Sequence, residues 1–455
     1  MHLSHGKFKG TAFTLVVLAL SACGGGSGGG SGDTDRESGE PSLTWTPPGG
    51  NATVAVDATH PFLQLTTSVD AADMLGVSQG RELFLAEWQA APGDRALLDG
   101  LGPLFNANSC GACHSSDGRV AVLEEDGSTT AAILFRLGNA AGSVHPEYGN
   151  QLQSSATAGA AEGSVTWQVS TTTGAIEYIA EILGDSALDD FQLGPRISPQ
   201  LVGVGLLDSV AQEQILEYAD EFDSNNDGIS GRAHWVTEEG LSQVGRFGWK
   251  AINATLRTQN AGAMHQDMGL TTPVNPDENC TGLQLICDAE PSGGSPEVSD
   301  ASLTAIVDFM TVLGVPDRRI SDQDQFDRGA RLFESVGCAS CHRPTLTSGP
   351  NDRFPSLGEQ TLYAYTDLLL HDMGEALSDG IREKDAEPSE WRTPPLWSIG
   401  LVEQAAGARF LHDGRAASIP EAIEWHGGEA SATLQRYQGL SASENADLLV
   451  FLRGI

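Results

Sequence analysis

The chain has 455 residues, enough for roughly two or three domains with hydrophobic cores of their own. Its 61 acidic and 25 basic residues give a formal charge of −36 at pH 7. This balance excludes a nucleic-acid-binding role, because phosphate binding requires a basic surface. The same charge suits either the steering of a basic partner protein or an acidic surface adapted to a salty habitat.

Residues 1–23 predict a lipoprotein signal peptide. An apolar run at 11–20, too short to span a bilayer, ends in the lipobox-like sequence LSAC, whose Cys23 would be lipidated. A Gly/Ser-rich tether at 24–32 favours this anchor over an ordinary secretory signal with an incidental cysteine. We expect a protein of the bacterial cell envelope that faces the periplasm or the outer surface. Lipid would be its only membrane attachment, and residues 24–65 would form a flexible linker.

Two copies of a C-x-x-C-H motif stand out, at residues 110–114 and 338–342. In this motif the two thiols bind the vinyl groups of a haem, and the histidine ligates the iron from the proximal side. A redox dithiol or half of a zinc site is the alternative for a single C-x-x-C. Two copies, each closed by histidine in an exported chain, favour two covalently bound haem c groups. The residues concerned are Cys110, Cys113 and His114 in the first motif and Cys338, Cys341 and His342 in the second.

Helical and extended patterns alternate around the first motif. Residues 77–88 have the apolar spacing of a helix. Within 120–195, residues 165–169 alternate between apolar and polar and residues 176–182 favour β structure, so a small β insertion is expected. Residues 200–219 return to a helical pattern.

The run D-x-N-x-D-G at 223–228 resembles the first half of an EF-hand calcium loop. Its ligand-type side chains are Asp223, Asn225 and Asp227. The twelfth position of such a loop would be His234 where a bidentate glutamate is required, which excludes a complete EF-hand. The run is therefore either a calcium site completed by distant ligands or an Asx-rich turn.

Two cysteines remain after the lipid and haem assignments, Cys280 and Cys287. In an oxidising compartment we expect them to form a disulfide. A metal-binding pair is the alternative, but no histidine lies nearby in the sequence to complete a site.

The second half repeats the order of the first. Residues 300–313 have the pattern of an amphipathic helix, residues 323–336 form another directly before the second motif, and residues 443–453 form the last. Each half thus runs helix, motif, loops and closing helix. The sequence predicts a mainly α fold with two class I cytochrome c-like domains, at 66–315 with the small β insertion and at 318–455.

Six further segments carry a family resemblance, in order around the two motifs. They are residues 105–109, 199–207, 245–250, 267–270, 371–374 and 409–415. In these segments the chain resembles the bacterial di-haem oxidoreductase family, a group of peroxidase-like proteins sometimes called thiol oxidoreductases. It is more distantly similar to di-haem cytochrome c peroxidases and to the enzyme that matures methylamine dehydrogenase. The resemblance covers about residues 70–455, while the β insertion and the acidic N-terminal linker lie outside the peroxidase pattern.

The resemblance implies a peroxide pocket at the first haem, with Trp249, Gln259 and Asp267 at the positions that match. The tryptophan would shorten the electron path between the haems, the glutamine would hydrogen-bond the bound oxygen, and the carboxylate would shuttle a proton between the peroxide oxygens. Aspartate replaces the family's glutamate at a shorter spacing, which leaves its reach open. The alternative is that Gln259 and Asp267 are ordinary polar helix residues. Met268 and His265 are candidates for a sixth ligand in a closed resting state.

At the second haem, His426 matches the position of the distal methionine in the peroxidases. Ligation by His426 would make this haem bis-histidine and lower its potential. Met373 is the rival ligand. His412 would lie near the haem propionates, and Arg415 would pair with one of them.

The function expected from these features is a di-haem c-type oxidoreductase that reduces peroxide with electrons from a small cytochrome c or cupredoxin. Oxidation of a protein or thiol substrate is a second enzymatic interpretation. The non-enzymatic alternative is an electron-transfer relay with both irons six-coordinate. The set of Trp249, Gln259 and Asp267 favours an enzyme, because a relay has no need of it.

Overall fold

The computed structural model describes residues 43–455 with short gaps. The gaps are residue 58, residue 96, residues 116–120, 173–174 and 184–187, residue 189 and residue 286. The predicted lipidation site, Cys23, lies outside the described residues. The described residues all belong to one compact unit. None of its helices has both the length and the apolar character of a membrane span.

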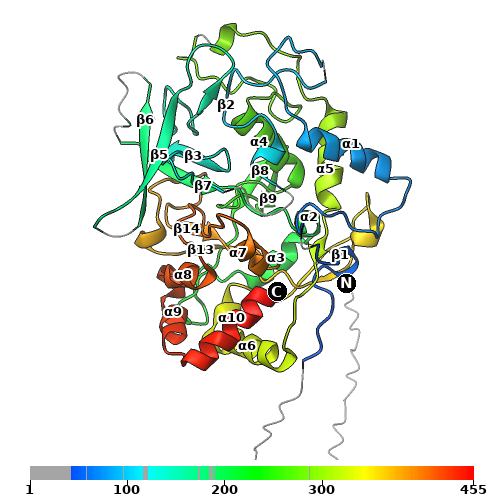
Figure 1. Cartoon of the computed structure of the whole chain (residues 1–455), viewed down its shortest axis with the longest axis vertical. Coiled ribbons are helices and arrows are strands. Elements are labelled where there is room, and N and C mark those ends of the chain that lie inside the picture. The colour runs from blue at the N-terminus through cyan, green and yellow to red at the C-terminus, as the bar shows by residue number, and fades with distance from the viewer. Residues whose placement is uncertain are drawn as a thin grey trace, which may run out of the picture. The chain divides into compact units, whose positions relative to one another are not determined.

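Each C-x-x-C-H motif follows a helix that packs against the helix closing the same half of the chain. α1 (Met74–Leu85) precedes the first motif and packs against α5 (Asp300–Thr311). α6 (Gln323–Val336) precedes the second motif and packs against α10 (Ala442–Gly454). In Figure 1, α1 and α5 lie together in the upper right, and α6 and α10 lie together at the lower edge. The helix–motif–closing-helix order predicted for each half is present.

Glycine allows both helix pairs to approach closely. A Cβ at Gly80 of α1 would clash with the carbonyl oxygen of Ala305 in α5. A Cβ at Gly329 of α6 would clash with the carbonyl oxygen of Asp447 in α10. Because glycine has no Cβ, each pair buries its apolar faces at short range.

In the part of the chain that the structure describes, three further helices lie between α1 and α5 and three between α6 and α10. They are α2 (Val204–Asp208), α3 (Gln212–Tyr218), α4 (Leu256–Met268), α7 (Ile399–Gln404), α8 (Ile419–Glu424) and α9 (Ser431–Gln438). The longest of them, α4, begins at a capping box in which Thr255 and Thr258 bond each other's backbone N–H. It ends at Gly269, which has a φ of 66°, so the chain turns sharply after Met268.

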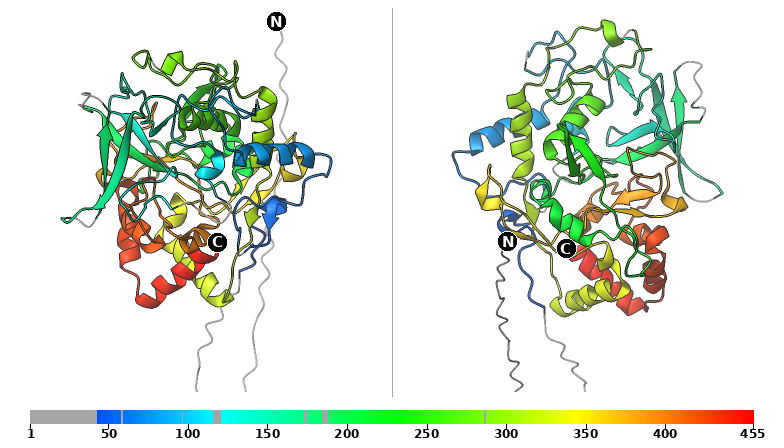
Figure 2. Two further views of the ribbon diagram at one scale, coloured as in Figure 1. Left: turned by 45° about the horizontal axis from the view of Figure 1, so that its top comes forward. Right: turned by 180° about the vertical axis from the view of Figure 1, so that it is seen from behind.

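The strands pair two by two. The antiparallel pairs are β2 (Leu104–Phe105) with β4 (Ser155–Ala156), β3 (Ile133–Gly138) with β7 (Gln192–Ile197), β5 (Gly163–Val169) with β6 (Ile176–Ile182), β8 (Trp235–Glu238) with β9 (Leu241–Val244), β11 (Leu346–Thr347) with β12 (Thr361–Leu362), and β13 (Leu370–Asp372) with β14 (Glu390–Arg392). β1 (Thr53–Val54) and β10 (Val315–Pro316) pair in parallel. The β5–β6 hairpin, which lies at one edge in both views of Figure 2, falls on the two segments predicted to be extended.

The predicted fold class, mainly α with two class I cytochrome c-like domains, is wrong. Helices account for only 29% of the described residues, and strands for 18%. After the first motif a small β insertion is expected, and β3–β7 pairs in addition to the two segments predicted to be extended; after the second motif loops are expected, but β11–β12 and β13–β14 pair as short ribbons. Pairing is the physical reason for the difference, because a buried connection must satisfy its backbone N–H and C=O groups.

Candidate functional site

The two C-x-x-C-H motifs, far apart in the sequence, border the same cavity. Its volume is about 1080 Å³. The motif residues that line it are Cys110, Cys113, His114, Cys338, Cys341 and His342. Each motif forms a short 3-10 turn, η2 (Cys110–Ala112) or η4 (Cys338–Ser340), and the four cysteines are not joined in disulfides. The structure therefore presents two thiols and one imidazole from each motif to one shared space.

At the first motif, the turn is fixed by the residue before it. The Ser109 hydroxyl accepts a hydrogen bond from the N–H of Ala112 at 3.1 Å, and the Cys113 thiol donates to the Ala131 carbonyl at 2.8 Å. The ring centroids of His114 and Phe84 are 6.3 Å apart. Burial, and then the charge of Asp267, raises the pKa of the Cys110 thiol to about 12.

Asp267 lies on the last turn of α4 and lines the cavity beside the first motif. Its backbone carbonyl accepts from the N–H groups of Asn106 and Ala107, just before the motif, at 2.8 and 3.0 Å. Its carboxylate accepts from Gln151 Nε2 at 2.9 Å. Burial raises the pKa of Asp267 to about 6, although the Gln151 hydrogen bond and the Arg136 charge both act to lower it. A carboxyl with this pKa can take and return a proton near neutral pH.

The three residues matched to a peroxide pocket all line the cavity but do not meet at one point. Gln259 and Asp267 are eight residues apart on α4, about 12 Å along the helix axis. Gln259 Oε1 accepts from Asn253 Nδ2 at 3.0 Å, and Trp249 Nε1 donates to the Ile197 carbonyl at 2.8 Å. Gln259 and Asp267 therefore border different parts of the space.

The two candidate sixth ligands of the first haem differ in position. Met268 is buried and lines the cavity. His265 is not among the described residues that line it, and its Nε2 lies 3.0 Å from the carbonyl oxygen of Asp277. Of the two, the structure brings Met268 to the cavity.

At the second motif, two imidazoles share the cavity wall. His342 Nδ1 lies 3.0 Å from the Tyr365 carbonyl oxygen, and His426 Nδ1 lies 2.9 Å from that of Ala422. Each bond orients its ring with Nε2 left for another ligand. Burial, and then the neighbouring His426, lowers the pKa of His342 to about 4; burial also lowers the pKa of His426. Both rings are thus neutral, the form that ligates iron. Met373, the rival ligand, lines the same cavity.

His371, from the predicted segment 371–374, lies between two carboxylates. Its Nε2 is 2.9 Å from Asp367 Oδ2, its Nδ1 is 2.7 Å from Glu429 Oε2, and the Cys341 sulfur is 3.6 Å from Nδ1. Burial opposes the charged ring, but bonding to Asp367 and Glu429 holds the pKa of His371 well above its usual value. A positive imidazolium neutralised by carboxylates therefore touches the second motif.

His412 and Arg415 approach the same oxygen of Asp413, with His412 Nε2 at 4.0 Å and Arg415 Nε at 2.6 Å, but they differ in whether they line the cavity. His412 lines the cavity and stacks on Trp391, with ring centroids 3.6 Å apart and planes at 9°. Burial, and then the Arg196 charge, holds the pKa of His412 well below its usual value. Arg415 is not among the described residues that line the cavity. It donates from Nε to Asp413 at 2.6 Å, and its guanidinium lies 4.6 Å from the Trp425 ring centroid.

The acidic run at 223–228 bonds within itself. Asp223 Oδ1 accepts from the N–H groups of Asp227 and Gly228, at 2.9 and 3.2 Å, and Asn225 Oδ1 accepts from the N–H of Asp227 at 2.8 Å. In the part of the chain that the structure describes, no group of three or more His, Cys, Asp or Glu side chains is arranged to hold a metal ion.

Elsewhere, Cys280 and Cys287 form a disulfide with their Cα atoms 5.9 Å apart.

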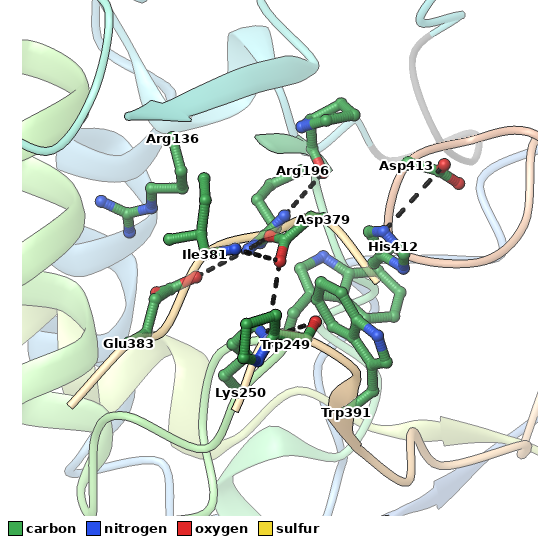
Figure 3. Close-up of polar contacts among 12 residues, drawn as sticks. Arg136, Arg196, Trp249, Lys250, Asp379, Ile381, Glu383, Trp391, His412 and Asp413 are labelled. Carbon is green, nitrogen blue, oxygen red and sulfur yellow. Dashed lines mark hydrogen bonds and ion pairs between the residues drawn. The ribbon is translucent and has the colours of Figure 1, made fainter. Parts of the chain in front are cut away.

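Sequence reasoning missed a cluster that lines the cavity around Trp391 (Figure 3). Lys250 Nζ and Arg196 Cζ lie 4.2 and 4.7 Å from the Trp391 ring centroid. Arg196 pairs with Asp379 and, at 2.7 Å, with Glu383. Lys250 lies in the segment 245–250 quoted for the resemblance, but no sequence pattern relates it to Trp391.

Comparison with known proteins agrees with the two-motif organisation. The family model described as "Di-haem oxidoreductase, putative peroxidase" matches residues 44–139 and 178–455, and the unmatched segment contains β5. No curated protein matches the chain. Among solved structures, a chain titled "Kuenenia stuttgartiensis Hydrazine Synthase Pressurized with 20 bar Xenon" aligns at 15% identity with a TM-score of 0.36. The alignment covers 94% of this chain and 100% of that one.

Proposed function

Because this chain belongs to the di-haem oxidoreductase family, we propose that it reduces peroxide at the first motif with electrons that enter at the second. Reduction of one peroxide to two waters consumes two electrons and two protons. The proposal assigns the electrons to a small redox protein, a cytochrome c or a cupredoxin, and the protons to groups in the cavity wall. The observation that carries it is the difference between the walls around the two motifs.

The residues of both motifs fit covalently bound haem. Each motif offers two unpaired thiols and one histidine to a cavity that both share. Cys110 and Cys113 would hold one haem and Cys338 and Cys341 the other, with His114 and His342 as proximal ligands. When bound, each haem supplies an iron that changes oxidation state and, with an open axial position, binds a small oxidant.

The wall at the first motif is suited to proton transfer. Asp267 lies beside the motif with its pKa raised to about 6. The hydrogen bond from Gln151 keeps the carboxylate oriented without neutralising it. Asp267 would therefore take a proton from the oxygen of the peroxide nearer the motif and return it to the farther one, so that water leaves.

The wall at the second motif is suited to electron transfer. His342 and His426 are neutral imidazoles on the same cavity wall, a pairing that favours six-coordinate iron. The carboxylates nearby, Asp367 and Glu429, are both engaged by His371. A basic donor protein suits a chain with a net charge of −36, because opposite charge speeds encounter.

A ferric spectrum and a rapid-mixing experiment test the proposal together. The oxidised protein should contain one high-spin and one low-spin haem, and the half-reduced protein should react with peroxide faster than a six-coordinate cytochrome does. Two low-spin haems with no reaction would leave the electron relay as the function. Rapid peroxide binding without electron uptake from a small donor protein would instead favour a protein or thiol substrate.

A further inference from the structure

We infer that Trp391, stacked on His412, is the aromatic step through which an electron crosses from the second motif to the first. The inference rests on the proposed function, because it requires electrons to move between the motifs. It assigns this role to a residue outside the set predicted from the sequence. One electron crosses, and no bond forms or breaks.

The first half of the path begins at the first motif. The carbonyl oxygen of Cys113 accepts a hydrogen bond from the Ser198 hydroxyl at 2.9 Å. The residue before Ser198, Ile197, donates its N–H to the carbonyl of His412 at 2.8 Å, and its own carbonyl accepts from Trp249 Nε1 at 2.8 Å. His412 and Trp249 are therefore both hydrogen-bonded to Ile197, whose neighbour Ser198 contacts the first motif.

The second half of the path begins at the second motif. The Cys341 sulfur lies 3.6 Å from Nδ1 of His371. His371 in β13 is the direct cross-strand partner of Trp391 in β14, so their side chains leave the ribbon on the same face. Trp391 then meets His412 in a parallel stack with centroids 3.6 Å apart. The path from Cys341 to Cys113 thus consists of the Cys341–His371 contact, the His371–Trp391 strand pair, the Trp391–His412 stack, and the hydrogen bonds of Ile197 and Ser198.

Trp249, the residue matched to the peroxidases, lies beside this path. Its ring centroid is 6.4 Å from that of His412 in an edge-on arrangement, a longer step than the His412–Trp391 stack. Its backbone carbonyl accepts from the N–H of Arg392, the neighbour of Trp391, at 2.9 Å. Trp249 therefore holds the two ends of the path together, while the closest ring stack on the path is that of Trp391 on His412.

Lys250 and Arg196 are positioning residues for the Trp391 ring (Figure 3). Lys250 Nζ donates to the carbonyls of Glu387, Pro388 and Glu390 at 2.6, 3.1 and 3.2 Å, so its ammonium is fixed beside β14. Both cations attract the face of the indole, and their charge is largely balanced because Arg196 pairs with Asp379 and Lys250 lies 3.7 Å from the same carboxylate. They therefore hold the ring in the position from which it stacks on His412.

The test measures electron transfer between the motifs in the protein with both haems bound. One electron is delivered by an external photoreductant, and its redistribution between the haems is followed at their absorption bands. Trp391→Phe should slow this redistribution by at least about tenfold, equivalent to about 1.4 kcal/mol of activation free energy. Haem content and both midpoint potentials should match the wild type. Trp397→Phe is the matched control, because Trp397 is also buried but does not line the cavity.

Several outcomes separate this inference from the proposed function. If Trp391→Phe redistributes the electron at the wild-type rate with unchanged potentials, the path does not use Trp391. If Trp391→Phe fails to fold, Trp391→Tyr takes its place, and a wild-type rate in that variant overturns the inference equally. If the wild type redistributes the electron but never reduces peroxide, the proposed function fails and the path stands, provided that the Trp391 variants are slow.

Discussion

The surroundings of the two motifs share a framework and differ in their walls. In both, a helix crosses its closing helix at a glycine and leads into a short turn that opens on the common cavity. Around the first motif the wall contains amides and the carboxyl group of Asp267, whose pKa burial raises to about 6. Glu162 is not among the described residues that line the cavity; it accepts from the N–H of Gln153 at 2.6 Å, and burial raises its pKa to about 7. Around the second, the carboxylates are bonded to a positive His371 and the other imidazoles are neutral. Under the proposed function, the attachment motif would determine where each haem binds, and the surrounding wall would determine whether that haem reacts with peroxide or transfers electrons.

The largest expected effect is the loss of one haem when the two cysteines of one motif are replaced. Replacing Cys110 and Cys113 with Ser should remove one covalent haem and leave the other, and replacing Cys338 and Cys341 should do the reverse. The reason is that thioether bonds form only at thiols. Mass spectrometry of the mature protein measures the haem count.

The remaining cysteine pair provides the control for this count. Cys280 and Cys287 form a disulfide, so their double Ser variant should retain both haems. Loss of both haems from either motif variant alone would mean that the two sites assemble as one.

The two motifs and the helices beside them could be predicted from the sequence, but the long-range contacts that build the cavity walls could not. The motifs are fixed by spacing within five residues, and the helices around them by apolar periodicity. Strands β13 and β14 have three residues each and are mostly buried, so they carry no alternating pattern. Pairs such as Trp391 with His412 or Lys250 with its three carbonyls depend on how distant loops meet, which no local spacing encodes.

The low-spin state proposed for the second haem can be tested at His426. His426→Ala removes the imidazole that shares the cavity wall with His342, so the second haem should change from low-spin to high-spin. Optical and electron paramagnetic resonance spectra measure the change. An unchanged low-spin spectrum, lost instead in Met373→Leu, would transfer the assignment to Met373.

A second histidine serves as the matched control. His265 lies outside the described lining of the cavity, and its Nε2 faces the Asp277 carbonyl. His265→Ala should therefore leave the spectra of both haems unchanged.

The peroxide reactivity proposed for the first site can be tested at Asp267. Asp267→Asn keeps the size of the side chain but removes the proton acceptor, and general acid–base groups typically contribute about 10²–10⁴-fold in rate. The reaction of the half-reduced protein with peroxide should slow by that order, with haem content unchanged. Rapid mixing, followed at the haem bands, measures it.

Asp208→Asn provides the matched control for this change. Burial raises the pKa of Asp208 to about 6 as well, but this residue is not among the described residues that line the cavity. Its variant should react with peroxide at the wild-type rate. Equal rates in wild type and Asp267→Asn would remove Asp267 from the mechanism and leave the enzyme intact.

The smallest expected effect is on the pH dependence of stability, and it has opposite signs for two buried carboxyls, Glu162 in the first half of the chain and Glu429 beside the second motif. Burial raises the pKa of Glu162 from 4.5 to about 7, so the folded state binds its proton more tightly than the unfolded state does. Its stabilising effect is complete below pH 4.5 and is lost as the pH rises through 7. Glu162→Gln resembles the protonated acid and should raise the free energy of unfolding at pH 8 by roughly 1–3 kcal/mol, with little change at pH 4.

Glu429→Gln should show the reverse dependence. Burial acts to raise the pKa of Glu429, but bonding to His371 lowers it below 4.5, so its stabilising effect is present above that pH and is lost as the pH falls through the folded value. This variant should be less stable than the wild type at pH 7, and the difference should shrink in acid. Urea unfolding of both variants from pH 4 to 8 measures the two trends. If the two variants instead change the free energy of unfolding with pH in the same direction, Glu162 and Glu429 have similar electrostatic surroundings, and the predicted contrast between them is wrong.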